Sequence, residues 1–519
     1  MPDRRTIVAP VPINGGGRRL SRLGAAVAFG LAVAVWPGHG ASAHAATVMV
    51  TTLADSGPGS LRQAIADAAP GDTITFASIA SSGTITLTSG QLTIGKSLTI
   101  DGPGVAALTI SGNNMSRVFA VAAGATVQIA GLTIANGSPS LSSSGAAGYL
   151  GGGVDNSGAL TLDSAVLRDN LSGAIDNTGA LTVSRTLISH NSGNTRLPFP
   201  AISAGGIANT SIVTVTSSTI ADNTAGAGPG FRYGNPAPGA DGGGIANGAG
   251  GTLTIANSTI YGNKAGVGGS NDDGSPTGRS GVGGNGGGVS NAASASATIL
   301  DSTIVGNAAG EGATPRNQYD DPGMGGSGGG IYNAPDPSHN SLGGSLTVAR
   351  SIVAGNAVGS GGHPRYTGDN GPDGTSPDCN GFQSGGDTLI DNIAGCSISG
   401  DTIGDILNQD PLLGPLQNNG GSTPTLLPFA GSPAIDQIPP DRCGMPTDQR
   451  GDARPADSGT GRAYCDIGAV EAQSGEAGTP PPASATPELG SGELLATGLL
   501  PLGLAIFARR RRARCPQAA

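Results

Sequence analysis

Gly151-Gly152-Gly153-Val154-Asp155-Asn156 opens a unit that recurs along the chain, and this unit decides the fold. A Gly-rich run, one apolar residue and one variable residue precede an asparagine again at Asn177, Asn209, Asn247, Asn291 and Asn333. An alternating strand such as Leu160-Thr161-Leu162 follows, and then a second strand that leads to another asparagine. These second asparagines are Asn170, Asn191, Asn223, Asn263, Asn307 and Asn356.

The spacing of the asparagines separates a core from its insertions. First and second asparagines lie 14, 14, 14, 16, 16 and 23 residues apart, whereas the gaps to the next unit are 7, 18, 24, 28 and 26 residues. One half of each unit is therefore nearly constant and the other half carries inserts. A β-propeller would need a constant period of ~40–50 residues, so the seven-residue gap before Asn177 argues against it.

The short strands have Ile, Val or Leu on one face and Thr or Ser on the other. One such strand cannot bury its apolar face alone, but coils stacked at ~4.8 Å close a common core and pair every backbone group. We therefore predict an all-β fold, a right-handed parallel β-helix of the pectate-lyase-like solenoid type, over residues 77–410. At ~20–25 residues per coil, plus inserts, ~11–14 coils are expected.

The second asparagines are expected to form a structural ladder. Asparagine tolerates the left-handed backbone region at a sharp corner, and its amide can bond to the backbone of the next coil. Each such bond contributes ~1 kcal/mol net.

Both ends of a solenoid need caps. Residues 44–76 are expected to form the N-terminal cap, in which Ser60-Leu61-Arg62-Gln63 is a capping box that opens a short helix, and Pro70-Gly71 ends it. Residues 411–471 form the Cys-containing C-terminal region, which is expected to be a disulfide-bearing cap. A Pro/Gly/Ser-rich linker follows over 472–493.

The two extreme segments indicate export. A basic region, an apolar run and Ala41-Ser42-Ala43 make residues 1–43 a signal peptide, with cleavage between Ala43 and His44. Arg18-Arg19 leaves the twin-arginine route open beside the general one. Residues 494–519 are apolar and then polybasic, which is typical of a membrane anchor or sorting tail.

The net charge argues against nucleic acid as a partner, and the cysteine content indicates disulfides in an exported protein. The chain carries −10 overall, and without residues 1–43 and 509–519 it retains 16 basic and 35 acidic side chains. Such a surface repels nucleic acid. Four cysteines in the exported part predict two disulfides, and proximity favours Cys379–Cys396 and Cys443–Cys465 among the three possible pairings.

Several segments resemble known bacterial surface modules. Residues 48–76 resemble the CSLREA domain, whose hexapeptide corresponds to Gly59–Ala64. Residues 411–471 resemble the choice-of-anchor Q domain, through Gln417–Gly421, Gly431–Asp436, Asp448–Gly451 and Asp466–Glu471. The repeats resemble those of polymorphic outer-membrane proteins, and Leu494–Gly498 resembles a sortase signal. These resemblances imply a bacterial surface β-helix with an interchangeable anchor, and no particular activity.

Chemistry-bearing residues are sparse. Asp155 and Asp176 share one repeat position, as do Asp169 and Asp222, and stacked acids could bind Ca²⁺ or, more commonly, remain solvated. No catalytic, cofactor or metal residue is predicted. The inserts before Asn209, Asn247, Asn291 and Asn333 are candidates for recognition or, equally, simple spacers. They carry aromatic, polar and charged residues, namely Phe199, Phe231-Arg232-Tyr233, Asn271-Asp272-Asp273 and Arg316-Asn317-Gln318-Tyr319-Asp320-Asp321.

We therefore predict an exported cell-surface protein with a non-enzymatic adhesion, binding or envelope role. Its partners would be a surface glycan or another envelope component, together with the membrane or sorting machinery at its tail. It would be a monomeric rod without nucleic acid. The alternative is a carbohydrate-active β-helix enzyme, either a polysaccharide lyase or a glycoside hydrolase.

Overall fold

The computed structural model describes residues 45–139, 151–194, 203–230, 236–270, 278–316, 320–336, 341–364 and 368–476. The expected signal peptide, the cleavage pair Ala43 and His44, most of the linker and the tail at 494–519 lie outside these residues. No helix within the described ranges is long and apolar enough to cross a membrane.

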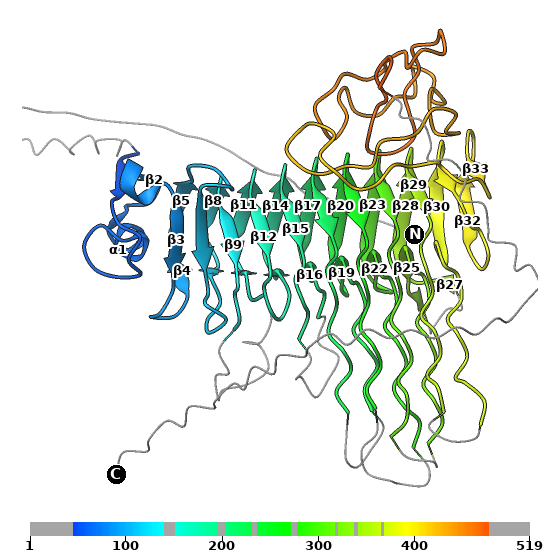
Figure 1. Cartoon of the computed structure of the whole chain (residues 1–519), viewed down its shortest axis with the longest axis horizontal. Coiled ribbons are helices and arrows are strands. Elements are labelled where there is room, and N and C mark those ends of the chain that lie inside the picture. Colours follow the sequence, from blue (N-terminus) through cyan, green and yellow to red (C-terminus); the bar gives the residue numbers. More distant parts are fainter. Residues whose placement is uncertain are drawn as a thin grey trace, which may run out of the picture. The chain divides into compact units, whose positions relative to one another are not determined.

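Three parallel sheets build the molecule (Figure 1). The 12-stranded sheet contains β1 (Thr47–Val50), β2 (Thr73–Phe76), β5 (Leu98–Asp101), β8 (Thr126–Ala130), β11 (Ala159–Asp163), β14 (Ala180–Ser184), β17 (Ile212–Thr216), β20 (Thr252–Ala256), β23 (Ser296–Leu300), β28 (Ser345–Ala349), β30 (Gly381–Gly385) and β32 (Ser397–Asp401). The 11-stranded sheet contains β3 (Gly83–Thr86), β6 (Leu108–Ser111), β9 (Thr133–Ala135), β12 (Val166–Arg168), β15 (Leu187–Ser189), β18 (Thr219–Ala221), β21 (Thr259–Tyr261), β24 (Thr303–Val305), β29 (Ile352–Ala354), β31 (Leu389–Ile390) and β33 (Ile406–Leu407). The 8-stranded sheet contains β4 (Leu92–Ile94), β7 (Phe119–Val121), β10 (Val154–Asn156), β13 (Ile175–Asn177), β16 (Ile207–Asn209), β19 (Ile245–Asn247), β22 (Val289–Asn291) and β25 (Ile331–Asn333).

Each complete coil contributes one strand to each sheet in turn, as β10, β11 and β12 do. Strands of successive coils pair in parallel and in register, so that Leu162 lies beside Val183. Both side chains are fully buried, as are their equivalents along the stack. The predicted right-handed parallel β-helix is confirmed. A small antiparallel hairpin, β26 (Pro335–Asp336) with β27 (Ser341–Leu342), interrupts one coil.

The asparagines form two continuous lines of side-chain hydrogen bonds. In the line of second asparagines, Nδ2 of Asn170 donates to Oδ1 of Asn191 at 2.9 Å, and the pattern continues through Asn223, Asn263, Asn307 and Asn356 to Asp378. The first asparagines, from Asn156 to Asn333, form a parallel line with distances of 2.7–2.9 Å. All these side chains are buried.

The expected backbone conformation of the ladder residues is wrong. The residue before each second asparagine adopts the left-handed region instead: Asp169, His190, Asp222, Gly262, Gly306 and Gly355 all have φ between 54° and 69°. The physical reason is that the amide must point inward to reach the next coil. The corner is therefore turned by the preceding residue; Asp169 and Asp222, for example, keep exposed side chains.

The N-terminal region is both a cap and the first part of the stack. Helix α1 (Leu61–Asp67) begins at Ser60, whose hydroxyl accepts the N–H of Gln63 at 3.2 Å, and it buries Leu61 and Ile65 against the core. The flanking strands β1 and β2 already belong to the 12-stranded sheet. The short 3₁₀ turn Ser78–Ala80 precedes β3.

Residues 411–476 lie along the outer face of the 11-stranded sheet (Figure 1). Gln449 bridges Thr219 and Thr259 through its amide, at 2.8 and 2.7 Å, and the N–H of Ala469 donates to Thr303 at 3.0 Å. The sequence predicts that this disulfide-bearing region caps the end of the stack. The structure places it on the flank instead, where threonine hydroxyls of β18, β21 and β24 offer hydrogen-bond partners.

The two predicted disulfides are confirmed with the favoured pairing. Cys379–Cys396 links the last coils, with Cα atoms 5.1 Å apart, and Cys443–Cys465 closes a loop within residues 411–476, with a Cα separation of 5.8 Å. In the chain-entropy description, loops of this size contribute about 3 kcal/mol each.

Candidate binding groove on a glycine-rich array

The described parts of the inserts after Asn223, Asn263, Asn307 and Asn356 are paired arms that stack on one another. Their outgoing arms cover 225–230, 265–270, 309–316 and 357–364, and their return arms cover 236–242, 278–286, 320–328 and 368–376. We call these eight segments the glycine array. In Figure 1 they extend away from the strands of the 8-stranded sheet as a layered bundle.

Backbone hydrogen bonds run through the array from arm to arm. N–H groups of Gly266, Gly284, Gly310 and Gly326 donate in turn to the carbonyls of Ala240, Gly266, Gly284 and Gly310, each at 2.8 Å. A second line of backbone hydrogen bonds lies three residues further from the strands. In it the N–H of Gly281 donates to the carbonyl of Gly269 and the N–H of Gly371 to that of Gly362, both at 2.8 Å. A three-residue period is that of the extended polyproline II helix, in which side chains repeat every third position.

Close approach of the arms requires glycine. A Cβ added to Gly310 would lie 1.8 Å from the carbonyl oxygen of Gly266, and one added to Gly374 would lie 1.7 Å from that of Gly326. The glycine content of the inserts therefore makes a packed array possible. Side chains that this array carries are held on a hydrogen-bonded scaffold, which is the usual setting of a recognition surface.

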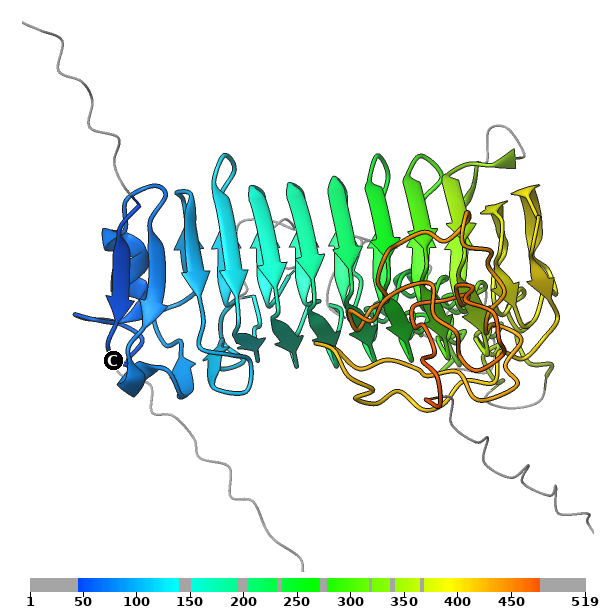
Figure 2. The ribbon, with the colours of Figure 1, turned by 90° about the horizontal axis from the view of Figure 1, so that it is seen from above.

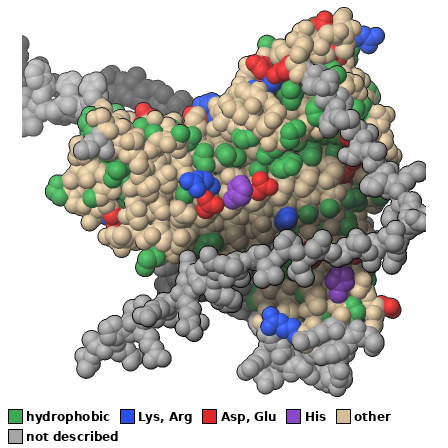
Figure 3. Space-filling model, in the orientation of Figure 1, with side chains coloured by type: hydrophobic (Ala, Val, Ile, Leu, Met, Phe, Trp, Pro, Cys, Tyr) green, Lys and Arg blue, Asp and Glu red, His purple; other side chains and the backbone are tan. Residues whose placement is uncertain are grey.

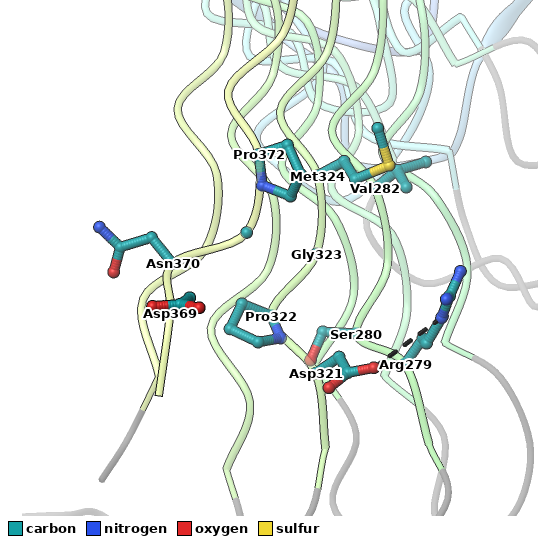
Figure 4. Close-up of a pocket in the computed structure, with 11 residues that line it drawn as sticks. Arg279, Ser280, Val282, Asp321, Pro322, Gly323, Met324, Asp369, Asn370 and Pro372 are labelled. Atoms are coloured by element: carbon teal, nitrogen blue, oxygen red, sulfur yellow. Dashed lines mark ion pairs between the residues drawn. The ribbon is translucent and has the colours of Figure 1, made fainter. Parts of the chain in front are cut away.

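The return arms carry two rows of side chains at this three-residue spacing (Figure 4). Arg279, Asp321 and Asp369 form the outer row, and Val282, Met324 and Pro372 form the inner one. Arg279 and Asp321 are register partners whose side chains approach to 4.0 Å and remain 85% and 79% exposed. Together with Ser280, Pro322 and Asn370 they line a groove of about 420 Å³, which we call the return-arm groove.

A second groove, of about 400 Å³, adjoins the first at Val282 and lies between the return arms and the 8-stranded sheet. Asp241 on its wall is half-buried and accepts the N–H of Asn285 at 2.6 Å. Burial raises the pKa of Asp241, and burial together with the charge of Asp241 raises the pKa of Tyr332. Oδ1 of Asn285 in turn accepts the N–H of Ser327 at 2.8 Å, so this row ties the arms together.

The predicted stacking of Asp155 and Asp176 is present, because the two residues pair in register on β10 and β13. Arg117, which the sequence analysis missed, lies beside them, with Nη1 at 3.0 Å from Oδ2 of Asp155. Burial, and then the charge of Asp155, raise the pKa of Asp176 to about 6, whereas Arg117 opposes that rise. Arg117 also donates to the carbonyl of Gly151 at 3.0 Å, so it ties adjacent coils together.

Other candidate acids have structural partners. Asp169 pairs with Arg168 at 2.6 Å, and Asp222 lies 4.0 Å from His190. Over the described ranges no group of three or more His, Cys, Asp or Glu side chains could hold a metal ion. Figure 3 shows few charged side chains over the strands on the face that it presents. The possible Ca²⁺ site stays a prediction.

The motifs at 448–451 and 466–471 form a buried ionic network. Arg450 pairs with Asp448 at 2.9 Å and Arg454 with Glu471 at 3.3 Å, and all four side chains are at most 1% exposed. Burial and the charge of Glu471 raise the pKa of Asp466 to about 7. These residues hold residues 411–476 in one conformation and are enclosed by protein, so they are not a surface site.

Several recognition residues proposed from the sequence lie outside the described ranges: Phe199, Phe231-Arg232-Tyr233, Asn271-Asp272-Asp273 and Asn317-Gln318-Tyr319. Arg316, Asp320 and Asp321 are described, and Asp321 lines the return-arm groove. Val282 and Met324 were not predicted from the sequence. The signal that could have found them is that each return arm has an apolar residue directly after a glycine, as in Gly281-Val282 and Gly323-Met324.

No family model matches the chain, and no curated protein does. Among solved structures, pectate lyase Pel9A is 13% identical, with 82% of this chain and 96% of that chain covered and a TM-score of 0.45. The cedar pollen allergen jun a 1 is 17% identical, covering 63% and 82%, with a TM-score of 0.32. The PL6 family alginate lyase AlyGC is 13% identical, covering 77% and 58%, with a TM-score of 0.26.

Proposed function

We propose that this chain is an exported cell-surface β-helix protein that binds a glycan without cleaving it, and that the return-arm groove is the binding site. The observation that carries the proposal is the groove itself. It is open, it lies on a scaffold of backbone hydrogen bonds, and it combines an apolar row with exposed acid, amide and guanidinium groups. Apolar surface with a few directed polar groups is the usual composition of a small-molecule or sugar site.

The charge of the groove narrows the ligand. Asp321 and Asp369 outnumber Arg279, and the chain as a whole carries −10. Anionic polymers would be repelled by both. We therefore expect a neutral or amino-sugar glycan of the envelope, and we expect the protein to act as a monomer.

A glycan array tests this function with matched methionine variants. The side chain of Met324 in the apolar row is 49% exposed, so Met324→Ala removes ligand contact without opening the core. This variant should weaken glycan binding about ten-fold, which corresponds to ~1.4 kcal/mol of binding free energy. Met115→Ala, at a side chain 72% exposed outside the array, should bind as the parent does. The proposal fails if no neutral or amino-sugar glycan binds, or if both variants bind alike.

A second candidate function is glycan cleavage at Asp155 and Asp176. The observation that favours it is the pair of carboxyl groups on adjacent strands, of which one has a pKa raised to about 6, because an acid and a base with separated pKa values are what glycoside hydrolysis uses. Release of reducing ends from glycans bound on the array, abolished by Asp176→Asn, would establish this function. Absence of release with bound glycans would exclude it for those ligands.

Export and anchoring complete the proposal. The disulfides are consistent with an oxidising compartment. We propose that residues 1–43 are removed at Ala43–His44 and that residues 494–519 hold the chain at the envelope through the membrane or a sorting enzyme. Deletion of 494–519 should move the protein from the envelope fraction into the medium, and unchanged fractionation would contradict an anchoring role.

A further inference from the structure

The outer face of the 12-stranded sheet carries one threonine per coil at the same position over six coils. These residues, which we call the threonine comb, are Thr161, Thr182, Thr214, Thr254, Thr298 and Thr347. Each is a direct register partner of the next, so the hydroxyls repeat at the strand separation of ~4.8 Å. Figure 2 shows the strands of this sheet side by side with little rotation from one to the next.

The comb is accessible and its hydroxyls are available. All six side chains are partly or fully exposed, and within the described ranges none of the hydroxyls has a protein hydrogen-bond partner. The C-terminal residues 411–476 lie on the 11-stranded sheet and leave this face open. Each threonine therefore offers a methyl group and an unpaired hydroxyl to whatever contacts the face.

Five of the six strands that carry the comb are uncharged and small. Strands β14, β17, β20, β23 and β28 contain no Asp, Glu, Lys, Arg, His or aromatic residue. The sixth, β11, ends in Asp163, which pairs with Arg185 at 2.6 Å at the corner after the strand. In a chain with net charge −10, a neutral face of five strands matches an uncharged occupant. The absence of aromatic rings from these strands removes the usual platform for stacking a sugar ring.

The free energy of binding to such a row favours a ligand that is already rigid before it binds. A hydrogen bond made in exchange for one to water contributes only ~1 kcal/mol net, and a flexible ligand loses ~0.5–1.5 kcal/mol for each group that it must immobilise. A mobile chain would therefore gain almost nothing from a row of threonines. A rigid lattice whose repeat is similar to the strand separation can contact all six threonines without losing conformational entropy.

We propose that the threonine comb binds ice. The strand separation is close to the spacing of equivalent oxygen atoms along one axis of hexagonal ice, so successive hydroxyls can occupy lattice positions while the methyl groups lie against the lattice. The occupant is neutral and rigid and needs no aromatic contact. This activity goes beyond the proposed glycan binding and uses a different face of the molecule.

Capture into slowly growing ice, together with inhibition of ice recrystallisation, tests the proposal on the exported chain. The parent protein should be enriched in the ice fraction, and the double variant Thr214→Lys/Thr254→Lys should be enriched at least about ten-fold less, since two ammonium groups cannot enter the lattice. Thr84→Lys is the control, because Thr84 is an exposed threonine of β3 in the 11-stranded sheet. It should behave as the parent does.

A further variant separates loss of the site from loss of the fold. Thr214→Val/Thr254→Val keeps the shape and the strand preference but removes both hydroxyls, and it should show reduced enrichment with an unchanged thermal melt. Exclusion of the parent protein from ice, or equal capture of the parent and the lysine double variant, would overturn the proposal. Neither outcome affects glycan binding at the return-arm groove, so failure of one function leaves the other standing.

Discussion

Asn263→Ala is expected to lower the free energy of unfolding of the β-helix by about 3–5 kcal/mol. The Asn263 amide donates to Asn307 Oδ1 and to the carbonyl of Ile220, both at 2.9 Å. Its Oδ1 accepts from the N–H and the Nδ2 of Asn223 at 3.1 and 2.9 Å. At ~1 kcal/mol per bond the loss approaches 4 kcal/mol, and buried donors left without partners add to it.

Denaturant unfolding measures this effect, with Asn418→Ala as the matched control. Asn418 is an exposed asparagine outside the β-helix whose side chain makes one local bond, to the N–H of Gly420 at 3.1 Å. Its replacement should change stability by no more than about 0.5 kcal/mol. A loss below 1 kcal/mol for Asn263→Ala would mean that the ladder accompanies the fold without stabilising it.

Gly310→Ala is expected to disrupt the glycine array, at a cost of about 3 kcal/mol or more. The new Cβ would lie 1.8 Å from the oxygen of Gly266 and 2.7 Å from the backbone nitrogen of Gly284. Both are backbone atoms, so no side-chain rotation relieves the clash, and the arms must separate. Amide hydrogen exchange in the arms 265–270, 278–286, 309–316 and 320–328 should accelerate, and glycan binding should fall with it.

Gly95→Ala is the control for that substitution. A Cβ at Gly95 meets nothing within 4 Å, and its φ lies outside the left-handed region. Alanine there restricts the unfolded chain, so stability should stay the same or rise by about 0.4–1 kcal/mol. If the two glycine variants exchange and melt alike, the array is not held by close backbone contact.

The fold could be predicted because its determinants are local and periodic. The distance between paired asparagines revealed the constant half of each coil, and the alternation of Leu160-Thr161-Leu162 revealed which face is buried. Cysteine pairing followed from proximity along the chain. Helix α1 followed from a capping box whose hydrogen bond is present.

What could not be predicted depends on contacts between distant segments. Arg117 and Asp155 are far apart along the chain and meet only because their coils are adjacent. The flank position of residues 411–476 depends on Gln449 reaching Thr219 and Thr259. The glycine array could not be recognised for a different reason. Gly281, Gly323 and Gly371 look like glycines of an ordinary surface loop, and their common three-residue period becomes visible only when the inserts are aligned with one another.

Shortening the inserts tests most directly the central claim that the glycine array carries the binding site. The inserts before Asn209, Asn247, Asn291 and Asn333, and the insert 357–376 after Asn356, would each be cut to the seven-residue spacing from Asn170 to Asn177. The core strands and both asparagine lines remain, so the thermal melt of the β-helix should survive, and binding to the glycans retained by the parent should be lost. Undiminished glycan binding by the folded, shortened chain would contradict the account and move the binding site to another face.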